Sequence, residues 1–200
     1  MSGLERLHDG YVAERRSRVL AHQLAEVMPQ AVSVLDVGCG DGSLARRLSA
    51  LRPDLVIRGT DVLLRPDAQI EVVEYDGLHL PENDEAVDVV LMVDTVHHST
   101  DPGQLLSEAR RVARNHLIIK DHLRNGLLAQ ETLRFMDRVG NARHGVALPY
   151  TYWSEAEWRE QWTEHALNIE VFRSKLHLYP RPFNLFFDRG LHFLTRLGLG

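Results

Sequence analysis

Three glycines at alternate positions follow a short apolar run and form the part of this chain best suited to chemistry. The run at residues 31–37 ends at Gly38, Gly40 and Gly42, and a helix-like pattern begins at Ser43. This order predicts a buried strand, a tight turn and a helix. Glycine permits positive φ angles and lets a ligand approach the backbone closely. With the free amides at the start of the helix, the turn predicts a cradle for a nucleotide-like ligand.

Acidic side chains stand beside this turn and after the next predicted strand. Asp36 and Asp41 flank the glycines, and two carboxylates suit a cationic ligand group better than a pyrophosphate. Asp61 comes about twenty residues after Gly42, where a carboxylate can accept hydrogen bonds from both hydroxyls of a ribose. Val62 is then placed to pack on an adenine face. The spacing G-x-G-x-G also differs from the dinucleotide-binding pattern G-x-G-x-x-G.

Strands and helices alternate along the chain, which predicts an α/β fold with a parallel sheet covered by helices on both faces. The predicted strands are 32–37, 55–59, 70–73, 87–93, 116–120 and 167–172. The predicted helices are 4–28, 43–51, 101–113, 127–139 and 154–165. The tail at 183–197 is ambiguous, because its apolar spacing fits a helix whereas Asp188-Arg189-Gly190 fits a hairpin into a final strand.

The stretch Val34-Leu35-Asp36-Val37-Gly38-Cys39-Gly40-Asp41-Gly42 resembles motif I of the class I S-adenosylmethionine (SAM) dependent methyltransferases. A second stretch, residues 87–112, resembles the segment of that family with two adjacent histidines, Asp-Pro and E-x-x-R-V. The resemblance covers residues 31–120. It implies a single Rossmann-like domain with a seven-stranded, mostly parallel sheet, helices on both faces and an antiparallel last strand. We therefore favour a strand in the tail.

The resemblance implies SAM as the cofactor, held at the ends of four strands. Asp76 would accept a hydrogen bond from the exocyclic amine of adenine, with the next residues against the ring, and Asp94 would lie near the methionine part. The expected cofactor residues are Asp36, Gly38, Cys39, Gly40, Asp41, Asp61, Val62, Asp76, Gly77, Leu78 and Asp94, together with Tyr11 from the N-terminal segment.

Methyl transfer from a sulfonium is an in-line displacement, so the protein must hold the donor and the acceptor in the reacting geometry. A general base is needed only where the acceptor loses a proton. Candidates follow the fourth and fifth predicted strands, and we expect His98, His122 and Asp121 to be catalytic. An alternative is a metal-assisted O-methyltransferase in which Asp94, Asp121 and His122 converge on a divalent ion. We expect no metal site.

Two segments outside the cofactor motifs are candidates for closing the site. Residues 1–30 predict a helical lid, in which Tyr11 and Arg15 lie one turn apart on one face. Residues 141–153 are rich in aromatic side chains, including Tyr152 and Trp153, that could stack on a planar or apolar acceptor.

Composition is that of an ordinary globular domain, with 44% hydrophobic and 26% charged residues among 200. The net charge of −5 argues against a nucleic-acid partner. No apolar run is long enough to span a membrane, and residues 1–10 lack the apolar region of a signal peptide. Cys39 is the one cysteine, so no intrachain disulfide forms, and we expect a cytoplasmic protein.

We expect one domain over residues 1–200, with a helical lid at 1–30, a cofactor-binding core at 31–120 and a substrate side at 121–200. The expected function is methyl transfer from SAM to a small molecule, with the oligomeric state open. The alternatives are a non-catalytic SAM-binding accessory protein, a nicotinamide-dependent oxidoreductase, which the glycine spacing disfavours, and an enzyme that uses the same fold for another reaction.

Overall fold

The computed structural model describes residues 3–30, 33–141 and 151–200, and their strands form one seven-stranded sheet. The strands are β1 (Ser33–Val37), β2 (Val56–Asp61), β3 (Val72–Glu74), β4 (Val87–Val93), β5 (Ala113–His122), β6 (Leu167–Arg173) and β7 (His192–Leu199). Their order is β3-β2-β1-β4-β5-β7-β6. The first five are parallel to one another, and β7 pairs antiparallel with both β5 and β6. The predicted topology is confirmed.

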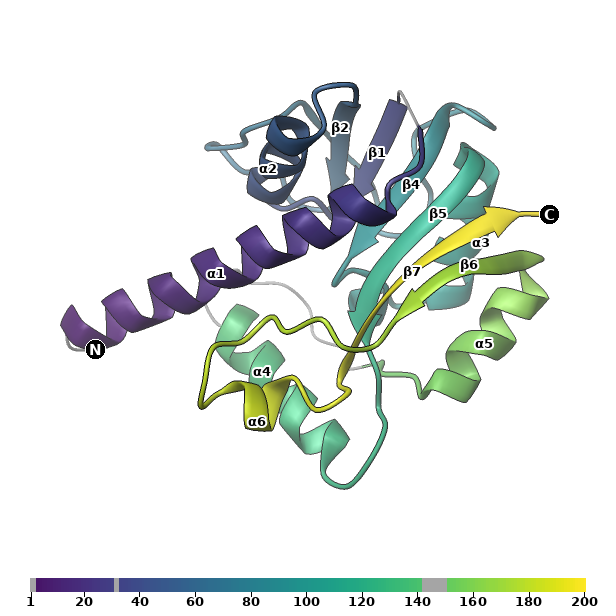
Figure 1. Ribbon diagram of the computed structural model, residues 1–200. Helices are drawn as coiled ribbons and strands as arrows, with labels where there is room; N and C mark the ends of the chain where they lie inside the picture. The colour runs from purple at the N-terminus through teal and green to yellow at the C-terminus, as the bar shows by residue number, and fades with distance from the viewer. Residues whose placement is uncertain (1–2, 31–32, 142–150) are drawn as a thin grey trace.

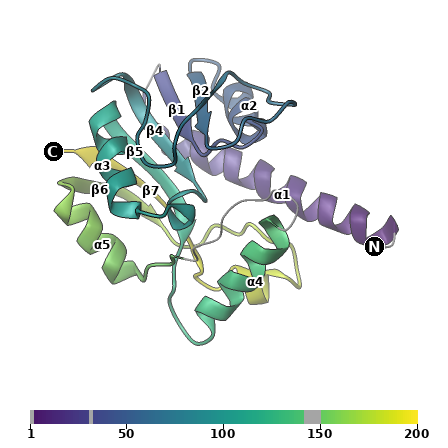
Figure 2. The same cartoon turned by 180° about the vertical axis from the view of Figure 1, so that it is seen from behind.

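Helices cover both faces of the sheet, as the sequence predicts. The helices are α1 (Gly3–Val27), α2 (Ser43–Leu51), α3 (Pro102–Val112), α4 (Ala129–Asn141), α5 (Glu155–Glu164) and α6 (Asn184–Phe187), with a short 3-10 helix η1 (Val96–His98). In Figure 1, α1 lies across one face of the sheet, and Figure 2 shows α3 and α5 on the opposite face. The two views also place α4 beyond the carboxyl ends of the parallel strands.

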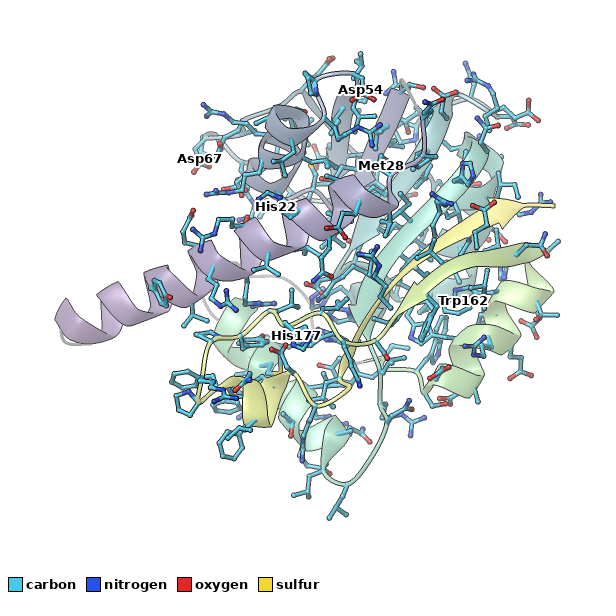
Figure 3. The ribbon with its side chains drawn as sticks, viewed as in Figure 1. His22, Met28, Asp54, Asp67, Trp162 and His177 are labelled. Carbon is cyan, nitrogen blue, oxygen red and sulfur yellow. The ribbon has the colours of Figure 1, made fainter. Side chains whose placement is uncertain are left out.

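Two apolar cores explain these layers. On one face, Leu20 and Leu24 of α1 and Leu48 of α2 pack on Val89 of β4 and Leu194 of β7. The other face is covered by α3 and α5, and their core includes the buried indoles of Trp158 and Trp162. Trp162 can be followed on α5 in Figure 3. Residues 89–92 of β4 and 117–119 of β5 are buried on both faces of the sheet, which is why these two stretches are entirely apolar.

Local sequence signals determine where two of the helices begin. Asp101 accepts a hydrogen bond from the amide of Gln104 at the start of α3, with Pro102 at the first helical position. Ser154 and Glu157 form the predicted capping box of α5. The loop that follows β4 and the chain that enters α5 are thereby held in place beside the carboxyl ends of the strands.

Strand ends are the main difference from prediction. β5 extends at both ends beyond the predicted 116–120, because β4 pairs with it at Ala113 and the antiparallel β7 pairs with it as far as His122. In the tail, residues 184–187 form the short helix α6, and the strand begins only at His192. The predicted final strand is therefore confirmed from His192 onward, and the helical spacing before it belongs to α6. Among the described residues, the helices lack the length and apolar character that crossing a membrane requires.

Candidate functional site

The glycine turn after β1 adopts the conformation that its composition predicts. Gly38, Gly40 and Gly42 all have positive φ angles, at 73°, 61° and 72°. A Cβ on Gly38 would lie 2.5 Å from Oγ1 of Thr95, so this position leaves no room for a side chain. A Cβ on Gly40 would meet nothing closer than 3.8 Å, at Arg65. Gly40 is thus open toward the space in front of the sheet, where a ligand can approach its backbone.

Asp61 joins the ends of β1 and β2. Its Oδ2 accepts a hydrogen bond from the amide of Gly40 at 2.8 Å, and its Oδ1 accepts one from the amide of Leu63 at 3.0 Å. The amide of Gly38 donates to the carbonyl of Thr60 at 2.7 Å. The carboxylate is therefore held in one orientation at the strand edge, with lone pairs left for a ligand hydroxyl.

Asp36 and Cys39 lie beneath the turn. Burial, together with the nearby charge of Asp61, raises the pKa of Asp36 to about 7. Burial and the charges of Asp36 and Asp61 raise the pKa of the Cys39 thiol to about 12. Such a thiol stays protonated and is a poor nucleophile, which supports the interpretation of Cys39 as a turn residue.

A second acidic turn follows β3. Asp76 accepts hydrogen bonds from the amides of Leu78 and His79, at 2.8 and 2.6 Å, and from the ring of His79. The bonds from His79 and Leu78 lower the pKa of Asp76 to about 2. Val62 is half exposed and lies close to Gly77: a Cβ added to Gly77 would be 3.3 Å from the side chain of Val62. The pair leaves an apolar surface bordered by a fixed carboxylate, as an adenine ring requires.

These turns open into a cavity of about 640 Å³, within the usual size of ligand pockets. Of the predicted residues, its lining includes Gly38, Gly40, Asp61, Val62, Asp76, Gly77, Asp94, His98 and His122. The lining also includes Arg16, Arg65, Tyr75, Thr95, His97, Asp137 and Tyr179, none of which was among the expected site residues. The glycine turn and the histidines after β4 and β5 therefore share one space.

Asp94 at the end of β4 is held among cationic groups. It has a φ of 54°, unusual for a residue with a side chain, and its carboxylate pairs with the buried Nζ of Lys120. Nη2 of Arg16 lies 3.9 Å from its other oxygen and Nε2 of His122 lies 3.6 Å from Oδ1. Although burial opposes ionisation, Lys120 and His122 hold the pKa of Asp94 well below its usual range.

A buried pair of a histidine and an aspartate forms the floor beside Asp94. Nδ1 of His97 lies 2.6 Å from Oδ1 of Asp121, and Nε2 of His97 lies 3.4 Å from Oδ2 of Asp137 on α4. The hydroxyl of Tyr152 donates to that same oxygen of Asp137. Burial opposes protonation of His97, but the charges of Asp121 and Asp137 outweigh it and raise the pKa to about 10.

The other three histidines of the cluster stay neutral. Burial, and then the charge of His97, lower the pKa of His98 to about 4. Burial also lowers the pKa of His122, and it lowers that of His192 on β7 still further with the help of Lys120. Nδ1 of His122 lies 3.1 Å from Nδ1 of His192. Nε2 of His122 is thereby directed toward Asp94 and Asp137, at 3.6 and 3.7 Å.

Some predicted residues lie elsewhere. The side chain of Tyr11 is 58% exposed and is absent from the cavity lining, so the structure does not bring it to the other expected residues. The helical stripe that reaches the cavity carries Arg16, four residues before the buried Leu20. The cavity lining also lacks five other expected residues: Asp36, Cys39, Asp41, Leu78 and Asp121. Of the predicted aromatic segment, residues 142–150 lie outside the described part of the chain.

Two of the missed residues left a signal in the sequence. Asp137 falls four residues after the buried Leu133 on the apolar stripe of α4, which marks a carboxylate that faces inward. Arg16 stands in the same relation to Leu20 and Leu24. The sequence carries no such signal for Tyr179 and His192, because their positions depend on how the last strands fold back beside β5.

Comparison with known proteins agrees with the geometry. The family described as "Methyltransferase domain" matches residues 35–118. Over 130 residues the chain is 31% identical to the 27-O-demethylrifamycin SV methyltransferase of Amycolatopsis mediterranei. That match covers 55% of this chain and 48% of the relative, so the chain spans about half the length of the curated relative it matches.

Solved structures share the whole fold at low identity. A SAM-dependent methyltransferase of Thermotoga maritima, described as a possible histamine N-methyltransferase, aligns over 98% of both chains with a TM-score of 0.64 and 21% identity. A putative methyltransferase in complex with the Trm112 activator of Haloferax volcanii aligns over 96% of this chain and 93% of that chain, with a TM-score of 0.65 and 18% identity. These likenesses concern the fold.

Proposed function

We propose that this chain, whose residues 35–118 match a methyltransferase domain, belongs to the class I SAM-dependent family and transfers the methyl group of SAM to a small-molecule acceptor. One observation carries the proposal. The open glycine turn at Gly38 and Gly40, with Asp61 fixed beside it, faces the same cavity as His98 and His122. A cofactor bound at the turn would direct its methyl group toward histidines that can accept or donate a proton.

The cofactor residues divide into three groups along the cavity. Asp61 would bind the ribose hydroxyls, and Val62, Asp76 and Gly77 with Leu78 would surround the adenine. The turn from Asp36 to Asp41, with Gly38, Cys39 and Gly40, would support the amino acid end, whose ammonium suits a site rich in carboxylates. Asp94, which lines the cavity at the end of β4, would lie near the methionine part of SAM.

His98 and His122 are our candidates for taking the acceptor's proton. Both line the cavity, and each presents a ring to it from the floor beside Asp94. Asp121 would act through His97, whose ring it orients at 2.6 Å, and is a positioning residue in this scheme. In the displacement itself, the acceptor atom bonds to the methyl carbon as the carbon–sulfur bond breaks, and the electron pair stays on sulfur.

The remaining segments would determine access and specificity. We propose that residues 1–30 act as a lid through Arg16 and that the acceptor end is supplied by residues 121–200, where Asp137 and Tyr179 line the cavity. A similar structure is a complex with an activator protein, so a protein partner is a further candidate. The single free cysteine, half-buried in the turn, suits a reducing compartment, and we propose the cytoplasm.

The test uses SAM with an isotopically labelled methyl group and a panel of small acceptors, each with a hydroxyl or amine on an apolar body. We expect labelled product and S-adenosylhomocysteine in equal amounts. His122→Gln should lower product formation about 100-fold or more and leave SAM affinity nearly unchanged. SAM binding without label transfer to any acceptor, in the presence and absence of a partner protein, would favour the accessory-protein alternative.

A further inference from the structure

The cavity floor contains two buried histidine nitrogens that make no hydrogen bond within the described part of the chain, one of which lies beside a carboxylate. Among the residues that the structure describes, neither Nε2 of His97 nor Nδ1 of His98 has a hydrogen-bond partner. His97 is only 2% exposed, so its ring nitrogen cannot rely on bulk water. Both residues line the cavity, and their rings lie 4.0 Å apart. Paired, unsatisfied nitrogens at the wall of a ligand cavity call for a ligand of their own.

A carboxylate completes the group. Oδ2 of Asp137 lies 3.4 Å from Nε2 of His97, and one ligand atom from each of His97, His98 and Asp137 falls within 4.8 Å of the others. Ligands of one divalent ion stand about 3–4 Å apart, because each is about 2.1 Å from the metal. The three side chains therefore need only small rotations to share an ion. We propose that His97, His98 and Asp137 bind a divalent transition-metal ion such as Zn²⁺.

The surrounding contacts are those of a supported metal site. Asp121 holds Nδ1 of His97 at 2.6 Å, which leaves Nε2 directed toward the ion, and metal-bound histidines are usually oriented by such a carboxylate. The hydroxyl of Tyr152 fixes the carboxylate of Asp137 in the same way. Two imidazoles and one carboxylate favour a borderline transition ion over Mg²⁺ or Ca²⁺, which prefer ligand sets made of oxygen.

The metal site that the sequence offers only as an alternative, at Asp94, Asp121 and His122, is disfavoured by what its members already bind. Asp94 pairs with the fully buried Lys120, whose charge occupies the place of a cation. Asp121 is committed to His97 and to the amide of His122, at 2.6 and 2.7 Å. A metal ion there would leave the ammonium of Lys120 buried and without its carboxylate.

The open coordination positions of the ion would face the cavity. An acceptor molecule with an oxygen atom would then bind the ion directly, and His122 would not be needed as a ligand. This role of the ion rests on the proposed function. The metal site itself does not, because its three ligands are defined without SAM.

The first experiment uses the full chain after dialysis against a chelator, without SAM. Zn²⁺ is added in a calorimeter, and Co²⁺ is added in a spectrophotometer to record its visible absorption. We expect one ion per chain with micromolar or tighter affinity. His98→Ala and Asp137→Asn should each weaken binding about tenfold or more, with folding checked by circular dichroism. His22→Ala, at an exposed histidine on α1 labelled in Figure 3, is the control for surface binding and should change nothing.

His122→Gln distinguishes the two ligand sets. It should keep the affinity for Zn²⁺ if His97, His98 and Asp137 hold the ion. Loss of binding in His122→Gln but not in His98→Ala, or absence of binding by the unmodified chain, would overturn the proposal. SAM affinity measured on the same metal-free sample reports separately on the proposed function, so the two proposals can fail independently.

Discussion

At the proposed cofactor end of the cavity, the lining is made of backbone amides and carboxylates from the turns after β1, β2 and β3, whereas at the proposed acceptor end side chains meet from η1, β5, α4 and β7. The first end depends on turns such as Gly38 to Gly40, whose shape follows from local sequence. The second depends on packing, because Asp137 and His192 come from elements far apart in the chain. A site made of turns can thus be predicted from a short stretch, and a site made of packed side chains cannot.

The charges at the two ends also differ in how they are balanced. At the proposed cofactor end, burial and the nearby charge of Asp61 raise the pKa of Asp36. At the acceptor end, each carboxylate has a cationic or donor partner: Asp94 has Lys120, Asp121 has His97 and Asp137 has Tyr152. Asp36 and Asp61 therefore repel one another, whereas each of these three carboxylates at the other end has a partner.

The largest expected effect comes from closing the open glycine turn. Gly40→Val adds a branched side chain at a φ of 61° in the only direction open to the ligand, and we expect SAM affinity to fall at least about 1,000-fold, or about 4 kcal/mol. Isothermal titration calorimetry measures this loss of SAM affinity. Gly190→Ala is the matched control, because its φ is 79° and a Cβ there meets nothing within 4 Å. Equal losses in the two variants would show that strain, and not blocking, is responsible.

The next prediction concerns the unbalanced charge of Asp36. Its pKa of about 7 exceeds the unfolded value of 3.8, so the native chain binds more protons than the unfolded chain between pH 4 and 7 and stability falls as pH rises. Asp36→Asn should stabilise the ligand-free protein by about 2–4 kcal/mol above pH 7 and by little below pH 4. Denaturant unfolding at the two pH values measures the difference. A gain that does not depend on pH would contradict the assignment.

Loss of the ribose carboxylate should have a smaller effect. We expect Asp61→Ala to weaken SAM binding by about 1–3 kcal/mol, the usual cost of removing hydrogen bonds to a charged acceptor. Asp67→Ala is the control, since Asp67 is exposed on the following loop (Figure 3). If the Asp61 variant kept its full affinity in the calorimeter, Asp61 would have no place in the cofactor site.

The smallest predicted effect concerns the hydrogen bond between Tyr152 and Asp137 at the proposed acceptor end. Tyr152→Phe removes the hydroxyl that donates to Asp137 and should lower stability by about 1–2 kcal/mol without changing SAM affinity. Tyr11→Phe, at an exposed ring on α1, should alter neither quantity. Thermal unfolding and calorimetry on both variants measure this. A change in SAM affinity with Tyr152→Phe would show that the two ends of the cavity are coupled.

How far the sequence predicts this site depends on distance along the chain. The order of strands and the turn at Gly38 and Gly40 follow from patterns within about ten residues, and the structure brings Asp61, Asp76 and Asp94 to one edge because parallel strands end together. The start of α5 was predicted for the same reason, since Ser154 and Glu157 are neighbours. Local signals were enough in each case.

Contacts that depend on the packing of distant elements could not be predicted from the sequence. Tyr11 was placed at the cofactor from the helical face it shares with Arg15, but the face of α1 that meets the cavity is set by Leu20 and Leu24. The partners of His97 on α4 and of His122 on β7 lie 40 and 70 residues away in the sequence. No local pattern specifies such a contact.

The most direct test of the account is a calorimetric titration of the unmodified chain with SAM and S-adenosylhomocysteine, with NAD as the control. The account predicts micromolar binding of the two sulfur nucleotides and none of NAD, because the turn at Gly38 and Gly40 is bordered by carboxylates that suit an ammonium and repel a pyrophosphate. Binding of NAD but not of SAM by the folded protein would contradict it and restore the oxidoreductase alternative.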